Sequence, residues 1–281
     1  MFQIEIHKLT YHYPGTDNAS LKDVSLKIPK GEFLGIIGAN NSGKSTFCCA
    51  LSGIVPHLYH GRTQGSIKVD GTDISTMGIG QIARNVGMVM QDPKNQLSGF
   101  HYTVFEEIAF SLENQGMKRD EIIEQVKRVL LMTGLQNLAE RSPYQLSGGQ
   151  QQRLVFAAAI ASEPSILVLD EPTTFLDPMG AKEVFKLLHR LNKQGVTIVI
   201  AEQRLELIAE YADRVIALDN GKVVLDGTPQ ETLTSPALEM IGLDWTRYTQ
   251  VALLAEEKGL WQDGQPLSVS FFDTVQGMGE K

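Results

Sequence analysis

Residues 38–46 constrain the fold of this chain more than any other stretch, because they match the phosphate-binding loop pattern at every fixed position. The apolar run Phe33–Ile37 precedes the loop as a buried strand would, and residues 44–51 contain no Gly or Pro and can continue as a helix. A strand, a glycine-rich loop and a helix in this order are the context that the pattern requires. The loop consists of Gly38, Ala39, Asn40, Asn41, Ser42, Gly43, Lys44, Ser45 and Thr46.

The chemistry of this loop suits a polyphosphate. Its glycines let backbone N–H groups turn inward at the start of a helix, where the helix dipole already favours negative charge. Lys44 would reach the β- and γ-phosphates, and the Ser45 hydroxyl is placed to bind a magnesium ion that bridges them. Thr46 is assigned to packing or capping. A glycine-rich turn that binds nothing is the alternative that this pattern alone leaves open.

Length, charge and hydropathy favour a globular protein and argue against a nucleic-acid-binding or membrane-spanning one. The 281 residues, 42% of them hydrophobic, are enough for one large or two modest domains with a full core. Thirty-three acidic against 25 basic residues give a formal charge of -8, which argues against a nucleic-acid partner. No apolar run approaches the roughly eighteen residues that a membrane span needs, so we expect a cytoplasmic protein.

The N-terminal part predicts antiparallel strands. Apolar and polar side chains alternate in Phe2–Ile6, in Leu21–Ile28 and in Ser66–Asp70, as in half-buried strands. Residues 11–15, Tyr-His-Tyr-Pro-Gly, are expected to form the turn between the first two. Within it, Tyr13 offers a flat ring that can stack on adenine. A tyrosine that only covers the rim of the sheet fits the sequence as well.

An acidic pair follows a strand that is expected at the centre of a parallel sheet. Ile166–Leu169 is short and wholly apolar, and Asp170 and Glu171 end it. Because ligands of open α/β sheets lie beyond the carboxyl ends of strands, this pair and the phosphate loop would face one site. Asp170 would orient magnesium through its water shell, and Glu171 would orient or deprotonate the attacking water. A helix-capping acidic pair is the alternative.

The rest of the chain alternates strands with helices. Strands are expected at Val86–Met90, Thr197–Ala201 and Val215–Leu218, and a helix at Lys182–Lys193, which together predict an α/β fold with a parallel sheet. A helical insert is expected from about residue 97 to residue 161.

A serine and two glycines begin a helix inside this insert. The residues are Ser147, Gly148, Gly149 and Gln150. Exposed N–H groups and a hydroxyl at a helix start suit a phosphate, although a plain N-cap has the same pattern.

With these stretches in order, the chain resembles the nucleotide-binding subunit of an ABC transporter over about residues 2–230. The resemblance matches Tyr13 to the adenine-stacking aromatic, Gly38–Thr46 to the Walker A loop, Gln91 to the Q-loop glutamine, Leu146–Gln150 to the ABC signature, Asp170 and Glu171 to the Walker B pair, and Asp177 to the D-loop aspartate.

The resemblance implies a P-loop ABC ATPase fold in residues 1–230, with an antiparallel β subdomain, a mostly parallel core sheet and a helical signature subdomain. It also implies ATP and Mg²⁺ as cofactors, with Gln91 beside both the metal and the reacting group. Two such subunits close head to tail, so that the signature of one completes the ATP site of the other. A second ATPase subunit is therefore implied, in a homodimer or a heterodimer.

Finer features are similar to the energising ATPases of energy-coupling factor (ECF) transporters, which import vitamins and transition-metal ions. The segment Gln91–Gln96 looks like the Q-helix of that group, although Lys94 and Asn95 replace its usual acidic residue. The resemblance implies a membrane scaffold subunit docked near this segment, a substrate-binding membrane subunit that acts indirectly, and a peripheral location on the cytoplasmic face of the membrane. Residues 231–281 would form a small C-terminal dimerisation region and a tail, and the last part, residues 268–281, has no clear periodicity.

One position departs from the ABC pattern. The family usually places a histidine against the γ-phosphate after the strand that follows the D-loop, and here that position is Gln203; the six histidines lie at 7, 12, 57, 60, 101 and 189. Glutamine can donate a hydrogen bond but cannot become cationic. Losing a transition-state contact typically costs on the order of a hundredfold in rate. Either Gln203 substitutes with modest loss, or this subunit pairs with a different one that carries the histidine.

The sequence therefore predicts an ATPase that drives transport, with Glu171, Gln91 and Gln203 at the reacting group. A regulatory or weakly hydrolysing ATP-binding partner of a second ATPase subunit is the alternative: Gln203 favours it, and the intact Glu171 argues against it. A soluble ABC ATPase that acts on ribosomes or DNA is a third reading, and the acidic charge weighs against it.

Overall fold

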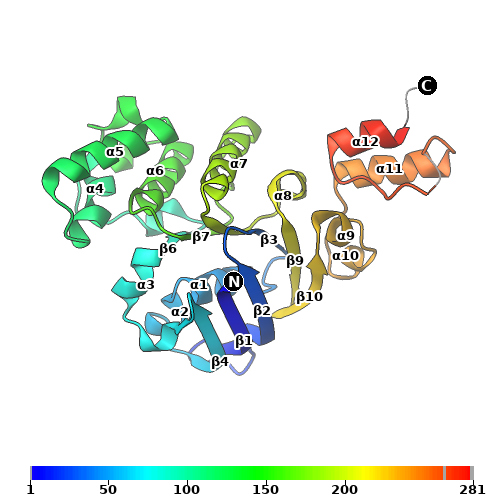
Figure 1. Ribbon diagram of the computed structural model, residues 1–281, viewed down its shortest axis with the longest axis horizontal. Coiled ribbons are helices and arrows are strands. Elements are labelled where there is room, and N and C mark those ends of the chain that lie inside the picture. The colour runs from blue at the N-terminus through cyan, green and yellow to red at the C-terminus, as the bar shows by residue number, and fades with distance from the viewer. Residues whose placement is uncertain (1, 262–263, 279–281) are drawn as a thin grey trace.

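The computed structural model describes residues 2–261 and 264–278, and two sheets form its framework (Figure 1). An antiparallel sheet contains, in spatial order, β2 (Leu21–Pro29), β1 (Phe2–His12), β4 (Arg62–Val69) and β5 (Thr72–Asp73). The core sheet contains, in spatial order, β10 (Lys222–Gly227), β9 (Arg214–Asp219), β3 (Phe33–Ile37), β8 (Thr197–Ala201), β7 (Ile166–Asp170) and β6 (Val86–Val89). Its strands from β9 to β6 are parallel, and β10 pairs antiparallel with β9. The expected mostly parallel α/β fold is confirmed.

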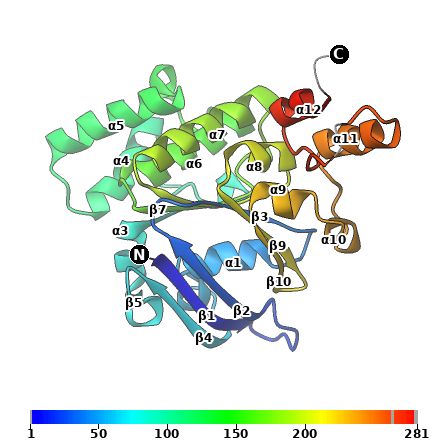
Figure 2. The ribbon, with the colours of Figure 1, turned by 45° about the vertical axis from the view of Figure 1, so that its right-hand side comes forward.

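The helices surround these sheets unevenly. They are α1 (Lys44–Leu51), α2 (Ile54–His57), α3 (Ile79–Asn85), α4 (Val104–Asn114), α5 (Arg119–Thr133), α6 (Gly148–Ala161), α7 (Pro178–Lys193), α8 (Leu205–Tyr211), α9 (Pro229–Leu233), α10 (Ala237–Met240), α11 (Arg247–Glu257) and α12 (Phe271–Met278). Figures 1 and 2 place α4 and α5 at one end of the molecule and α11 and α12 at the opposite end. Helices α4, α5 and α6 all lie within the predicted helical insert. In the described part of the chain, every helix is too short or too polar to cross a bilayer.

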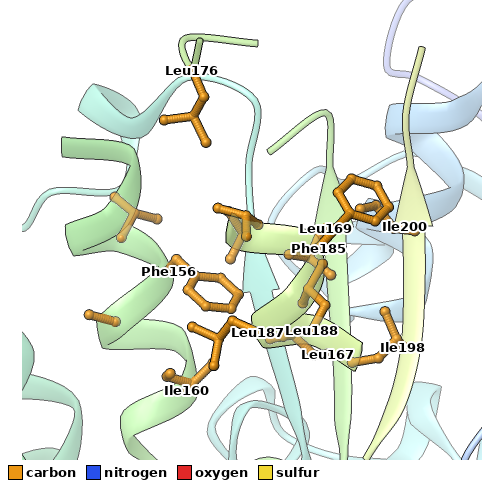
Figure 3. Packing of buried hydrophobic residues seen from close by; sticks show 14 of the residues in the cluster. Phe156, Ile160, Leu167, Leu169, Leu176, Phe185, Leu187, Leu188, Ile198 and Ile200 are labelled. Atoms are coloured by element: carbon orange, nitrogen blue, oxygen red, sulfur yellow. The ribbon is translucent and has the colours of Figure 1, made fainter. Parts of the chain in front are cut away.

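The core lies on both faces of the parallel sheet, because successive residues of a strand point to opposite sides. Along β7, Ile166 and Val168 face the cluster that contains α1 and the antiparallel sheet, whereas Leu167 and Leu169 face α4–α7. All five residues of β7 are buried, which is why its sequence is an unbroken apolar run before Asp170. On the second face, Phe185 of α7 packs against the strands (Figure 3) and stacks on Phe33 at 6.3 Å between ring centroids.

The predicted turn at residues 11–15 is wrong at its start. Strand β1 continues to His12, and Tyr11 and His12 pair with residues of β4. A register shift near Lys8, whose φ is 45°, lets the strand bend and continue. The chain reverses only after Tyr13, at Pro14 and Gly15.

Two further elements differ from the sequence prediction. The strand predicted to reach Met90 ends at Val89, because the Gln96 side chain accepts from the Met90 N–H (2.6 Å) and donates to the Met88 carbonyl (3.0 Å). The stretch without clear periodicity contains the helix α12, and residues 279–281 of that stretch lie outside the described part.

Candidate active site

The phosphate-loop sequence connects β3 to α1, and its glycines are required by its backbone. Gly38 and Gly43 have φ values of 156° and 109°, in the region where side chains are strained. A Cβ atom at Gly43 would lie 2.8 Å from the Ser20 carbonyl oxygen, and one at Gly38 would meet the Ser42 hydroxyl. The loop therefore keeps its shape only with glycine at these two positions.

Lys44, the first residue of α1, is held inside this loop. Its side chain is 5% exposed, and its ammonium donates to the carbonyl oxygens of Gly38 (2.8 Å) and Ala39 (3.1 Å). The same nitrogen lies 3.5 Å from a carboxylate oxygen of Glu171 at the end of β7. A buried positive charge is thus fixed between the loop and the acidic pair.

The Glu171 carboxylate is the meeting point of the predicted catalytic residues. Gln91, which follows β6, donates its amide to Oε2 at 2.9 Å, and Gln203, which follows β8, donates its amide to Oε1 at 2.9 Å. The Gln203 amide also lies 3.4 Å from the Asn40 side-chain oxygen. Glu171 is 7% exposed, and each of its carboxylate oxygens accepts a hydrogen bond from a protein donor.

Asp170 offers an oxygen suited to a metal ion. Its Oδ1 atom is buried and has no hydrogen-bond partner among the described residues. Burial raises the pKa of the Asp170 carboxyl; a hydrogen bond from Ser45 opposes this rise and the charge of Glu171 adds to it.

Asp170 and Ser45 fit a magnesium ion better than a cation that takes all of its ligands from the protein. Within residues 2–261 and 264–278, no three His, Cys, Asp or Glu side chains gather as a metal cluster. Magnesium needs few protein ligands, because it keeps several waters and takes phosphate oxygens. Asp170 and the Ser45 hydroxyl are therefore a sufficient protein contribution.

An open pocket of about 860 Å³ lies over the loop. Tyr13 lines it, with its ring 4.9 Å from that of Tyr11 in an edge-on contact and its hydroxyl 3.2 Å from the Thr46 hydroxyl. Thr46 is buried but also lines this pocket, so its assignment to packing or capping stays a prediction. Half-buried on the pocket wall, Tyr13 is placed both to cover the sheet and to face a ligand, so stacking on adenine stays a prediction.

Sequence reasoning missed several residues of the pocket wall. Asn18 and Ser20 precede β2, Lys22 is its second residue, and Asn220 and Gly221 form the β9–β10 turn. The start of β2 contacts the β9–β10 turn, because the Lys22 backbone N–H donates to the Gly221 carbonyl oxygen at 2.8 Å. Among these residues, only the pair Asn220-Gly221 forms a recognisable sequence pattern. That pattern predicts a turn and gives no indication of a pocket.

The signature residues lie elsewhere. Ser147 caps α6: its hydroxyl accepts from the Gln150 N–H at 3.3 Å, and the Gln150 side chain accepts from the Ser147 N–H at 3.0 Å. Gly149 packs beside Leu176, where a Cβ atom would come within 3.2 Å of that side chain. Among the described residues that line the 860 Å³ pocket, none comes from Ser147–Gln150.

Asp177 also has a local partner. Its carboxylate accepts from the Gly180 N–H at 2.6 Å and caps α7. Within this chain, Asp177 and the signature are both helix caps, and their predicted roles at a nucleotide stay predictions.

Comparisons with known proteins agree with this geometry. The sequence profile of the ABC transporter family matches residues 21–174. A protein of Pyrococcus abyssi named as an ABC transporter ATP-binding protein is 39% identical over 259 residues, which cover 92% of this chain and 92% of that protein. A similarly named protein of Methanosarcina acetivorans is 40% identical, and the match covers 89% of this chain but 41% of that longer protein.

Solved structures resemble the chain over most of its length. CbiO1 of Clostridium perfringens, described as part of the ABC transporter complex cbiONQ, has a TM-score of 0.74 at 33% identity and covers 91% of this chain and 99% of its own. The ATP-binding cassette MJ0796, described as a dimer in a post-hydrolysis state bound to ADP and Pi, has a TM-score of 0.71 at 28% identity and covers 80% of this chain and 98% of its own.

Replacing Lys44 tests whether this pocket binds nucleotide. Lys44→Ala removes the buried ammonium that faces the loop, and hydrogen bonds to charged groups contribute about 1.5–3 kcal/mol, so the Kd for ATP should rise by roughly tenfold to a hundredfold. Equilibrium titration with a fluorescent ATP analogue measures it. Lys27→Ala is the matched control, because Lys27 is exposed on β2 and pairs with Glu5. Equal affinity in the two variants would contradict the assignment of the pocket.

Proposed function

The chain belongs to the ABC transporter family of ATP-binding proteins, and we propose that it hydrolyses ATP to drive an importer of the energy-coupling factor type. The observation that carries this proposal is the Glu171 carboxylate, which is buried beside the phosphate loop and held by Lys44, Gln91 and Gln203. A base in this position can act on a water molecule that attacks a phosphate bound in the loop.

In the proposed reaction the phosphates of ATP lie against the N–H groups of residues 38–45, and Lys44 moves its hydrogen bonds from the loop carbonyls to the phosphates. Asp170 and Ser45 would hold magnesium, which when bound neutralises part of the phosphate charge. Glu171 orients or deprotonates the attacking water, and the amides of Gln91 and Gln203 keep its carboxylate in place. Closure and reopening of the assembly would then move the membrane partner.

The proposal includes a second ATPase subunit. The residues Ser147–Gln150 at the N-terminus of α6 are not among the described residues that line the pocket of their own chain, so a nucleotide in that pocket would meet a signature only if another chain supplied it. MJ0796 is described as a dimer, which supports a paired assembly. Whether the second subunit is identical to this chain or different is a separate question, on which Gln203 bears.

Two observations support the ECF type. The likeness to cbiO1 extends over 91% of this chain, so it includes part of the region that follows residue 230. The segment Gln91–Gln96 forms a short 3₁₀ helix at Pro93–Asn95, with Asp92 accepting from the Lys94 N–H at 3.0 Å. The first residue of this segment, Gln91, itself donates to Glu171, so a membrane scaffold docked on the segment would contact the same few residues that reach the Glu171 carboxylate. The chain would then lie peripherally on the cytoplasmic face of the membrane, and its cargo would be a vitamin or a transition-metal ion.

A regulatory role is the second candidate. Gln203 occupies the place of a residue that can carry a positive charge, and an amide stabilises a developing negative charge less. In a pair with a different subunit, the intact signature of this chain would complete the partner's site while its own site turned over slowly.

The two candidates differ in how turnover responds to Gln203→His. In the slow-site account, Gln203→His raises ATP turnover by about tenfold or more, because an imidazolium can stabilise the γ-phosphate charge. Glu171→Gln, which removes the base and keeps the shape, should abolish turnover by the chain alone in either account. Phosphate release by the chain alone, across protein concentration, measures both variants without the turnover of a partner's site.

A rise of no more than about twofold for Gln203→His in the chain alone would exclude the slow-site account. Turnover by the chain alone that persists in Glu171→Gln would contradict hydrolysis at this site.

The C-terminal region supplies a candidate dimer surface. Seven apolar side chains of α11, α12 and the segment between them are 38–68% exposed: Val251, Leu254, Leu260, Phe271, Phe272, Val275 and Met278. Such a concentration on two short helices is typical of a surface that another subunit covers. We propose that it contributes to dimerisation.

Charge at this surface should weaken the dimer. Phe272 is 67% exposed, so Phe272→Asp costs little folding energy but should raise the dimer dissociation constant by about tenfold or more. Sedimentation velocity without nucleotide, over a range of protein concentrations, measures the change. Met240→Asp is the control, because Met240 is 88% exposed on α10, outside this surface. Identical dissociation constants for the two variants would contradict a role of α12 in assembly.

A further inference from the structure

A buried carboxylate next to the active site has no role in the reaction described above. Glu202, which follows β8, is 3% exposed, and its carboxylate accepts hydrogen bonds from three residues. Its Oε1 atom accepts from the backbone N–H groups of Gln203 (2.8 Å) and Arg204 (3.2 Å). Its Oε2 atom accepts from the Thr173 hydroxyl at 2.5 Å. One side chain therefore joins the residues after β8 to the loop after β7.

Arg204 strengthens the same connection from the other side. Its guanidinium donates to the carbonyl oxygen of Leu176 at 2.8 Å and lies 3.4 Å from that of Thr173. Glu202 and Arg204 thus hold the segment 173–176 through a hydroxyl and two carbonyls. Gln203 lies between them in the sequence, and its backbone N–H is one of the groups that Glu202 fixes.

The position of this carboxylate is electrostatically unfavourable. Asp170 and Glu171 already bring two carboxyl groups to the site, and the charge of Glu202 contributes to the raised pKa of Asp170. Burial also raises the pKa of Glu202 itself. Removing a carboxylate from water costs free energy unless its hydrogen bonds are well made. An apolar side chain would avoid this cost but could not accept the two N–H groups.

The Gln203 side chain depends on the backbone that Glu202 fixes. Glutamine has three rotatable side-chain bonds, and its amide must reach Oε1 of Glu171 at 2.9 Å. Fixing the N–H groups of residues 203 and 204 sets the direction in which that side chain leaves the chain. Without this restraint, the amide would sample orientations that do not reach Glu171.

We propose that Glu202, with Arg204, is a positioning residue that holds the Gln203 amide on the Glu171 carboxylate and fixes it relative to the segment 173–176. This inference rests on the proposed function of Glu171 and Gln203. Glu202 acts only through Gln203, so its replacement should matter only while the Gln203 amide is present.

A measurement that does not require turnover tests the position of the amide. In protein labelled with ¹⁵N at glutamine side chains, the Gln203 amide signal is identified by its loss in Gln203→Ala. Glu202→Gln leaves the shape but gives only one acceptor oxygen, so exchange of the Gln203 amide hydrogens with solvent should accelerate by about tenfold. Thr173→Val, which removes one hydrogen bond at the same carboxylate, should give a smaller acceleration in the same direction.

Glu206→Gln is the matched control. Glu206 lies three residues from Gln203 on α8, and its carboxylate accepts from the Arg247 side chain at 2.9 Å and makes no hydrogen bond to Gln203 within the described part of the chain. The variant Glu206→Gln loses a carboxylate from the same segment without disturbing the Glu202 contacts. In this variant the Gln203 amide hydrogens should exchange with solvent at the same rate as in the unmodified chain. Unchanged exchange in Glu202→Gln, or equal acceleration in Glu206→Gln, would overturn the proposal.

Turnover provides a second, independent readout in the chain or complex that hydrolyses ATP. Glu202→Gln should lower kcat by about tenfold with KM for ATP changed less than about twofold, and this loss should disappear in the Gln203→Ala background. Equal losses of kcat with and without the Gln203 amide would indicate a merely structural role and overturn the inference. Absence of any ATP hydrolysis that depends on Glu171 would instead reject the proposed function, and the exchange rates would still decide whether Glu202 positions Gln203.

Discussion

The buried contact between Lys44 and Glu171 is the interaction on which the rest of the site depends. A lysine that is 5% exposed next to a glutamate that is 7% exposed would be unstable if either charge were left without partners. The loop carbonyls of Gly38 and Ala39 complete the shell of the ammonium, and the amides of Gln91 and Gln203 complete that of the carboxylate. These partners follow three different strands, β3, β6 and β8, so the parallel sheet is what allows them to meet.

The sheet order explains why these particular segments meet. Strand β8 lies between β3 and β7, and β6 lies next to β7, so the residues that follow all four strands emerge at one edge. The same edge carries the loop at 173–176, which Glu202 and Arg204 hold against the segment that follows β8. A shift of the segment that follows β8 would thus change the positions of both the Gln203 amide and this loop. The hydrogen bonds that join the two segments are the basis of the role inferred for Glu202.

Local sequence patterns predicted the parts of this structure that local physics determines. The phosphate loop, the buried strand before Asp170 and the cap at Ser147 each have short-range signals, namely glycines at strained positions, an unbroken apolar run and a serine at a helix start. The family resemblance added Gln91 and Gln203, because nothing in their neighbouring residues shows that two amides would converge on Glu171. That convergence depends on strand order, which periodicity does not encode.

Other features depended on contacts between distant segments and were missed for that reason. The turn predicted at residues 11–15 includes Tyr11, but Tyr11 is fully buried in β1 because its partner strand β4 continues beside it. Lys22 and Gly221 meet on the pocket wall although about two hundred residues separate them in the sequence. The predicted roles of Asp177 and of the signature depend on a second chain and remain predictions.

The central claim is that the site over the phosphate loop is completed by the signature of a second chain. Mixing two inactive variants tests it most directly: Lys44→Ala, which keeps an intact signature, and Ser147→Arg, which keeps an intact phosphate loop. For this chain assembled as a homodimer, each variant alone should be inactive, and an equimolar mixture should recover about a quarter of the unmodified turnover, because half of the dimers then contain one complete site. A mixture as inactive as its components, measured where the unmodified chain hydrolyses ATP, would contradict a site shared between two chains.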